Sequence, residues 1–261
     1  MSTTSSPLNG ALDFDFDRSH LPGSSYGYSG TALSQLADGA TEYTLATIVV
    51  DGSGSTGGFR REMQDAVGQI VVGCQRNPRA DNMMLRLVEF DDDVREEHGF
   101  KMLTRCNPGD YADFMRLGGT TALYDSADNA VGAMVAYGQQ LTDQQYAVNG
   151  IAVVITDGGD NASKLSATAV KKRVEDALRG EVLESLVLIL VGLNPAKDAA
   201  LTKALSDFAQ DAGFRYIDIT DLTPAKFAKL ADFISRSVSA QSQSLGTGGP
   251  SKPIDASQLV I

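Results

Sequence analysis

The chain has 261 residues, of which 43% are hydrophobic, and its 33 acidic and 22 basic residues give a formal net charge of −11. This length and composition suffice for one large domain with a hydrophobic core. The negative charge and the lack of a basic run argue against binding to nucleic acid or to an anionic membrane surface.

The sequence also favours a reducing compartment. Cys74 and Cys106 are its only cysteines, which suits two buried thiols better than a disulfide framework. The N-terminus has no apolar signal-peptide core, and no run approaches the roughly 20 apolar residues of a membrane span. We therefore expect a cytoplasmic protein.

Residues 1–43 are polar and rich in Ser, Gly and Tyr, which predicts an N-terminal arm rather than a folded unit. Within it, residues 12–17 alternate apolar and acidic side chains, the period of a strand. Such a strand would either pack on its own domain or add to the sheet of a partner. In the second case the arm could also join copies of this chain.

A buried strand follows the arm. Five of the six residues from Leu45 to Val50 are apolar, as in a strand covered on both faces. The strand leads into Asp51-Gly52-Ser53-Gly54-Ser55, and four glycines between residues 52 and 58 allow a sharp turn. An acid and two hydroxyls at alternate positions can hold a hard cation through oxygen.

Helical and strand patterns alternate over the rest of the chain. Apolar stripes at helical spacing predict helices over residues 59–75, 122–137, 167–179, 198–212 and from 223 onward. Apolar or alternating runs predict strands over residues 83–90, 94–103, 150–156, 186–191 and 214–219. We also expect a short helix near 111–116, and an acidic turn at 91–93 that makes 94–103 an antiparallel edge strand.

This alternation predicts an α/β fold: a doubly wound, mostly parallel sheet with one antiparallel edge strand and helices on both faces. The predicted domain spans residues 44–240, after the arm of residues 1–43. Residues 241–261, rich in Ser, Gln, Gly and Pro, are predicted to form a flexible tail. Ligands of such sheets bind beyond the carboxyl ends of the strands, where the strand order reverses.

Three loops with acids, hydroxyls and glycines fall at such positions. Residues 51–55 and 157–160 each follow a predicted strand, and residues 118–121 precede a helix. If the strands that end near Asp51 and Asp157 are neighbours, their carboxylates repel each other, and a divalent cation would reverse that repulsion. The oxygen donors and the lack of clustered His or Cys favour Mg²⁺ over zinc.

These loops resemble the metal-ion-dependent adhesion site of the von Willebrand factor A family, over about residues 43–240. The family pattern is Asp-x-Ser-x-Ser, then a distant Thr, then a distant Asp. The matching residues here are Asp51, Ser53, Ser55, Thr121 (with Thr120 as the adjacent alternative) and Asp157.

The resemblance implies a Rossmann-like fold and a binding module rather than an enzyme. It implies Mg²⁺ or Mn²⁺, rather than Ca²⁺, at these five side chains, with an Asp or Glu of a protein partner completing the shell. Intracellular bacterial members often act as scaffolds beside ATPases, kinases or stress-response proteins, so the resemblance implies a partner of that kind.

Two alternatives stay open. Residues 52–57 also fit Gly-x-Gly-x-x-Gly of a dinucleotide site, although Asp51 would then adjoin a pyrophosphate and no basic residue occurs before Arg60. A metal-dependent hydrolase using Asp157 is the other. The only histidines, His20 and His98, are expected at the surface, so no general base is evident.

Overall fold

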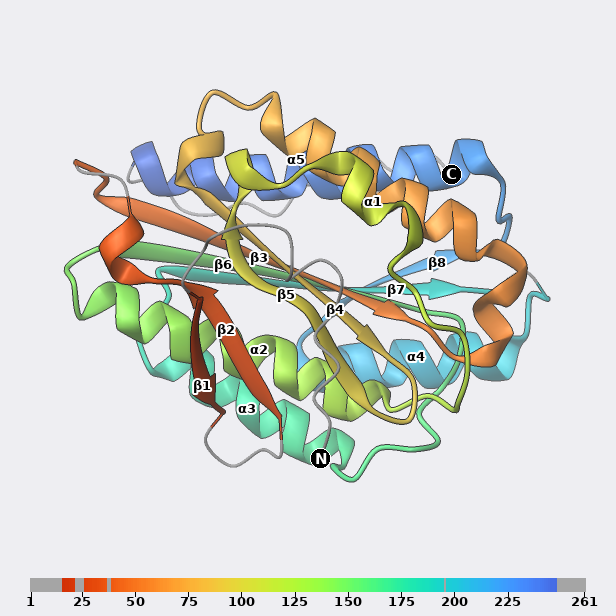
Figure 1. Cartoon of the computed structure of the whole chain (residues 1–261). Helices are drawn as coiled ribbons and strands as arrows, with labels where there is room; N and C mark the ends of the chain where they lie inside the picture. The colour runs from red at the N-terminus through yellow and green to blue at the C-terminus, as the bar shows by residue number, and fades with distance from the viewer. Residues whose placement is uncertain (1–15, 22–25, 37–38, 195, 248–261) are drawn as a thin grey trace, which may run out of the picture.

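The structure, a computed structural model, describes residues 16–21, 26–36, 39–194 and 196–247. These residues form one eight-stranded sheet between two layers of helices (Figure 1). The strands are β1 (Phe16–His20), β2 (Gly27–Thr31), β3 (Glu42–Asp51), β4 (Met83–Phe90), β5 (Val94–Met102), β6 (Ala147–Thr156), β7 (Ser185–Leu193) and β8 (Arg215–Ile219). The α-helices are α1 (Arg60–Gln75), α2 (Leu123–Thr142), α3 (Ala167–Arg179), α4 (Ala199–Ala212) and α5 (Pro224–Thr247).

The order of the strands is β1-β2-β5-β4-β3-β6-β7-β8. The run from β4 to β8 is parallel, whereas β5 pairs antiparallel with β4. The predicted doubly wound, mostly parallel α/β fold is thereby confirmed. From β3 the chain goes first to β4 on one side and later to β6 on the other, so the strand order reverses between β3 and β6.

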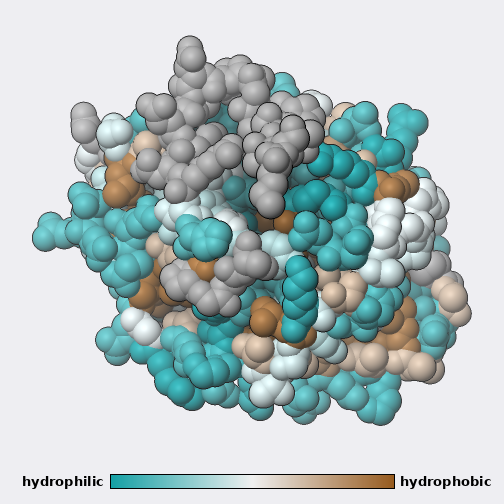
Figure 2. All heavy atoms as spheres, turned by 60° about the horizontal axis from the view of Figure 1, so that its bottom comes forward, coloured by the Kyte–Doolittle hydropathy of each residue, from teal (hydrophilic) through white to brown (hydrophobic). Residues whose placement is uncertain are grey.

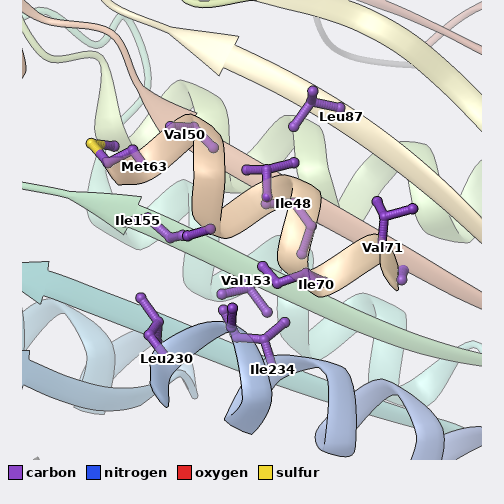
Figure 3. Close-up of a cluster of buried hydrophobic side chains, with 14 of the residues drawn as sticks. Ile48, Val50, Met63, Ile70, Val71, Leu87, Val153, Ile155, Leu230 and Ile234 are labelled. Carbon is purple, nitrogen blue, oxygen red and sulfur yellow. The ribbon is translucent and has the colours of Figure 1, made fainter. Parts of the chain in front are cut away.

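Both faces of the sheet are buried, which explains why its central strands are mostly apolar. On one face, α1 and α5 pack against alternate residues of β3 and β6, and Figure 3 shows the contacts of Ile48, Val153, Ile70 and Ile234. On the other face, α2, α3 and α4 cover the intervening residues, such as Leu45 and Val154. Seen with the bottom of Figure 1 turned forward, the described surface is mostly hydrophilic, with small separate hydrophobic areas (Figure 2).

Local signals set several helix ends. The Ser166 side chain accepts a hydrogen bond from the Ala169 amide and starts α3, as its N-cap position predicts. Asp198 caps α4 in the same way, and Gly213 ends that helix with a φ of 79°, a conformation that glycine adopts without strain.

The N-terminal segment departs from the expected arm. Residues 27–31 form β2 parallel to β5, and residues 16–20 pair antiparallel with β2, so both strands extend the sheet. Consequently β5 is antiparallel as predicted but does not lie at the edge. Residues 12–15 of the alternating pattern lie outside the described residues.

Two further elements differ from expectation. Helix α5 continues to Thr247, beyond residue 240, and its residues Gln241 and Ser242 are buried. The short helix expected near residues 111–116 is a 3₁₀ segment, η6, over Pro108–Asp113. Pro108 is in its first turn and the Asn107 side chain accepts a hydrogen bond from the Gly109 amide, so the segment begins earlier than its hydrophobic residues indicate.

Candidate metal centre

The carboxylate of Asp51 lies at the carboxyl end of β3, fully buried beside β6. One of its oxygens accepts a hydrogen bond from the Ser53 amide at 2.8 Å, and the other accepts one from Thr156 Oγ1 at 2.6 Å. The register pairs Val50 with Ile155, which places Asp51 and Thr156 next to each other. The reversal of strand order thus brings the ends of two strands distant in sequence together.

Hydroxyl groups connect this strand end to Asp157. The Ser53 and Ser55 hydroxyl oxygens are 3.1 Å apart, and Ser55 donates to Asp157 Oδ1 at 2.8 Å. Because a serine has a single hydroxyl proton, Ser55 accepts from Ser53 in this arrangement. Four of the five residues singled out in the sequence therefore lie in one short hydrogen-bonded set.

Thr121, the fifth residue, reaches the same region from the start of α2. A Cβ on Gly158 would lie 3.1 Å from Thr121 Oγ1, so this hydroxyl is adjacent to the residue after Asp157. The backbone of Thr121 is held by Asn161: its amide donates to Asn161 Oδ1 at 2.8 Å, and its carbonyl accepts from the Asn161 amide at 3.0 Å.

Burial sets the electrostatics of the two carboxylates. It raises the pKa of Asp51 to about 6, and the charge of Asp157 acts in the same direction, against hydrogen bonds from Thr156 and Ser53 that lower it. Burial also raises the pKa of Asp157, while the Ser55 hydrogen bond lowers it. Both ionised forms are thus disfavoured, and a cation between them would offset that cost.

Glu89 lies next to the loop of residues 51–55, here called the serine loop, and was not predicted from the sequence. Its side chain has no exposed area, accepts from the Arg116 amide at 2.5 Å and pairs with Arg95. Burial raises its pKa to about 7. A Cβ on Gly52 would be 2.5 Å from Glu89 Oε1, so the carboxylate occupies the space that a side chain at residue 52 would need.

Backbone hydrogen bonds join the loop after β3, the turn after β4 and the loop before α2. The Gly52 amide donates to the Phe90 carbonyl at 2.7 Å, and the Gly52 carbonyl accepts from the Gly118 amide at 3.0 Å. The Ala122 amide donates to the Asp91 carbonyl at 2.6 Å. The loops after β3 and β4 and the loop before α2 therefore form one connected rim.

Sequence reasoning missed several of these residues for different reasons. Thr156 had a local signal, since it is a hydroxyl residue directly before Asp157 in an apolar strand. Asn161 and Glu89 had none, because their roles depend on contacts with residues far away in the chain.

Two groups that were expected at the surface, the acidic turn of residues 91–93 and His98, are buried in part or in full. In the turn, Asp92 and Asp93 are exposed, but Asp91 is buried and accepts two hydrogen bonds from Arg95, at 2.8 and 2.7 Å. The expectation that His98 lies at the surface was wrong: it is buried, and its Nε2 lies 3.0 Å from the Tyr111 hydroxyl. Burial lowers its pKa to about 4.

The donor set distinguishes this centre from a thiolate or imidazole site. Across the part of the chain that the structure describes, no three or more His, Cys, Asp or Glu side chains converge as metal ligands. The candidate centre instead combines two carboxylates with three hydroxyls, which are hard donors that suit Mg²⁺ with water in the remaining positions.

Comparison with solved structures shows a shared fold. The PilB minor pilin from Streptococcus sanguinis superposes with a TM-score of 0.56 at 13% identity, covering 81% of this chain and 64% of PilB. Proximal thread matrix protein 1 from the mussel byssus, with a zinc-occupied MIDAS motif, superposes with a TM-score of 0.50 at 18% identity. The match covers 77% of this chain and 46% of that protein. The SpaC pilus adhesin from Lactobacillus rhamnosus GG superposes with a TM-score of 0.52 at 12% identity, covering 75% of this chain and 30% of SpaC.

The chain therefore spans about half to two thirds of the first two of these proteins, and less of the third. No curated protein sequence matches it. Within the described residues, no helix has both the length and the apolar character to cross a membrane.

Sequence comparison identifies the family independently of these structures. The profile of the von Willebrand factor type A domain matches residues 47–236, which include the second half of β3, all of β4 to β8 and the loops of the candidate centre. The chain belongs to the von Willebrand factor type A domain family, whose domains mediate protein–protein interactions.

Proposed function

We propose that this protein is a metal-dependent protein-interaction module. In this proposal Asp51, Ser53, Ser55, Thr121 and Asp157 hold one Mg²⁺ or Mn²⁺ ion. An Asp or Glu of a partner protein supplies a further oxygen ligand.

The observation that carries the proposal is the hydrogen-bonded set from Asp51 through Ser53 and Ser55 to Asp157. It gathers hard oxygen donors at the point where strand order reverses, the usual ligand position in such sheets. Burial raises the pKa values of both carboxylates, and the charge of Asp157 adds to the rise for Asp51. A divalent cation would favour their ionised forms.

The metal would supply a positive charge that attracts a carboxylate from outside. The protein side chains orient that charge toward the surface, since Ser55 is exposed while Asp51 is buried. Two protein carboxylates leave a divalent ion without excess negative charge, so a third carboxylate can still bind.

The first test is the effect of Mg²⁺ on thermal stability. Mg²⁺ should raise the melting temperature of the wild type, and EDTA should reverse the rise; at 100 times the Kd, binding adds about 2.7 kcal/mol. Asp51→Ala should abolish this response while its circular dichroism spectrum stays that of the wild type.

Asp113→Asn is the matched control, because Asp113 of η6 is an exposed acid that pairs with Arg60 of α1. It should respond to Mg²⁺ as the wild type does. If Asp51→Ala and the wild type respond equally, the metal centre is refuted.

The same assay tests the alternatives. NAD or NADP should cause no shift, because Asp51 and Asp157 would repel a pyrophosphate at this loop. The wild type should not hydrolyse phosphoester or peptide substrates in Mg²⁺. We further propose a cytoplasmic location, a homo-oligomer formed through the N-terminus, and a partner that is an ATPase, a kinase or a stress-response protein.

A further inference from the structure

Helix α2 has no side-chain cap of its own at its N-terminus. Ala122 occupies the N-cap position and makes no side-chain hydrogen bond there, although the first amides of a helix need acceptors. The acceptors come from the loop after β6, which also carries Asp157. Ser163 Oγ accepts from the Tyr124 and Asp125 amides, at 3.0 Å each. This loop therefore caps α2 from outside the helix.

Helix α2 also binds the loop through Asp125. The Asp125 carboxylate is buried and accepts from the Lys164 amide at 3.1 Å and from the Leu165 amide at 2.9 Å. Because the bonds run in both directions, the loop after β6 and the first turn of α2 hold each other in one relative position. The segments that present Thr121 and Asp157 are thereby attached to each other beside the candidate centre.

Within this attachment, Asn161 is the residue that holds Thr121 itself. The Thr121 amide donates to Asn161 Oδ1 at 2.8 Å, and the Thr121 carbonyl accepts from the Asn161 amide at 3.0 Å and from the Ala162 amide at 3.2 Å. Both backbone polar groups of Thr121 are thus fixed by one short stretch of the neighbouring loop. The Thr121 hydroxyl remains directed toward Gly158, where a Cβ would lie 3.1 Å from it.

The chain before Thr121 does not fix this position by itself. Gly118 and Gly119 precede it, and glycines allow many backbone conformations. A hydroxyl that is held in place before an ion arrives lowers the entropy cost of binding. Asn161 is exposed and lies in no helix or strand, so the hydrophobic core does not require its side chain.

We propose that Asn161 is a positioning residue of the metal centre. Its side-chain oxygen holds Thr121 so that the threonine hydroxyl meets the ion together with Asp157. This inference rests on the proposed function, because it concerns the ion that those residues hold. It adds a residue outside the five ligands on which metal affinity depends, and the dependence passes through Thr121.

Mn²⁺ binding to the full chain, measured by electron paramagnetic resonance of the free ion, tests the inference. Asn161→Ala should weaken Mn²⁺ binding about 10- to 100-fold, the usual effect of removing a residue that orients a metal ligand. Asn161→Asp keeps an acceptor oxygen for the Thr121 amide, and its charge does not oppose a cation, so it should bind Mn²⁺ at least as tightly as the wild type. Weakening as large as that of Asn161→Ala would overturn the proposal.

Ser166→Ala is the matched control for stability. Ser166 lies in the same connection between β6 and α3, and it caps α3 by accepting from the Ala169 amide at 3.3 Å. Its loss should lower the melting temperature by about 2–4 °C without changing the affinity for Mn²⁺. If Ser166→Ala weakens Mn²⁺ binding as much as Asn161→Ala does, the effect is one of general stability and the proposal fails.

A double-mutant cycle tests whether Asn161 acts through Thr121. In a Thr121→Ala background, Asn161→Ala should weaken Mn²⁺ binding less than about twofold, because no hydroxyl remains to be positioned. A residue that supports only the loop after β6 would weaken binding by the same factor in both backgrounds. Equal factors would therefore contradict the proposal.

The outcomes separate this inference from the proposed function. If the wild type binds Mn²⁺, Asp51→Ala does not, and Asn161→Ala binds it as the wild type does, the inference is wrong and the metal centre stands. If the wild type binds no Mn²⁺, or Asp51→Ala binds it equally well, both proposals are wrong.

Discussion

Gly52 joins two loops of the candidate centre through its backbone. Its amide and carbonyl bond to Phe90 and Gly118, and its missing side chain makes room for the buried carboxylate of Glu89. Because Glu89 also bonds the Arg116 amide, the position of the serine loop depends on a close contact that any Cβ would disturb.

Gly52→Ala should therefore lower the free energy of unfolding by about 1–3 kcal/mol, the usual cost of overpacking. Gly54→Ala is the control two residues away and should change it by less than about 0.5 kcal/mol, because its Cβ meets nothing. Urea denaturation of both variants measures the difference. Equal stabilities would mean that Glu89 moves away freely.

The raised pKa of Asp51 predicts a pH dependence of the metal-free protein. A carboxyl whose pKa rises from 3.8 unfolded to about 6 folded binds more protons in the folded state between these values. Its stabilising contribution is complete below pH 3.8 and is lost as pH rises past about 6.

In EDTA, the difference in unfolding free energy between wild type and Asp51→Asn should thus fall by roughly 2 kcal/mol from pH 4 to pH 7. Glu89, whose pKa rises to about 7, adds a similar loss to both proteins, which cancels in the difference. Denaturation at several pH values measures it. A constant difference would show that the pKa of Asp51 is not raised.

At the scale of elements, a buried ionic network attaches β2 to the sheet. Glu96 of β5 accepts from Ser29 Oγ and from Arg86 Nε, each at 2.5 Å, and Arg86 of β4 donates to Asn129 of α2 at 2.9 Å. Arg86 is fully buried. The network therefore links β2, β4, β5 and α2 in one place.

Glu96→Ala should cost about 3–5 kcal/mol of stability, because it leaves the Arg86 charge buried and unpaired. Adding Arg86→Met should recover part of that loss by removing the charge. Lys172→Ala, which breaks an exposed pair with Asp176 on α3, should cost at most about 0.5 kcal/mol. Chemical denaturation of the wild type, Glu96→Ala, the double variant and Lys172→Ala measures their free energies of unfolding. A double variant less stable than Glu96→Ala would contradict this account of the network.

At the scale of the whole molecule, the N-terminal strands complete the sheet beyond β5. The Gly30 backbone lies against the Tyr137 ring, where a Cβ would be 2.4 Å from Cε2, and Tyr137 donates to the Thr31 carbonyl at 2.7 Å. Phe100 of β5 stacks on Tyr137 with ring centroids 5.1 Å apart and is fully buried. Removing β2 would expose this apolar contact and an unpaired strand.

Deletion of residues 1–36 should therefore produce self-association and a lower melting temperature, because β5 becomes an open edge. Deletion of residues 1–15 keeps every described strand and serves as the control. Light scattering after size exclusion measures both. A monomeric protein of wild-type stability after the longer deletion would show that β1 and β2 are dispensable.

Much of the fold follows from local patterns. The apolar run of β3, the stripe of α1, the Ser166 cap and the Gly213 end each depend on residues close in sequence, so periodicity and capping preferences predict them. The five candidate ligands were also recognisable, because each stands in a short motif at the end of a strand or the start of a helix.

Other features were decided only by the tertiary structure. The addition of β2 to β5, the burial of Glu89 and His98, and the bonds of Thr156 and Asn161 all join residues far apart in the chain. Their energies come from pairing and desolvation that no local pattern records. The sequence by itself thus determined which groups could form a site and most helices and strands between residues 44 and 240, whereas strand order determined which of those groups meet.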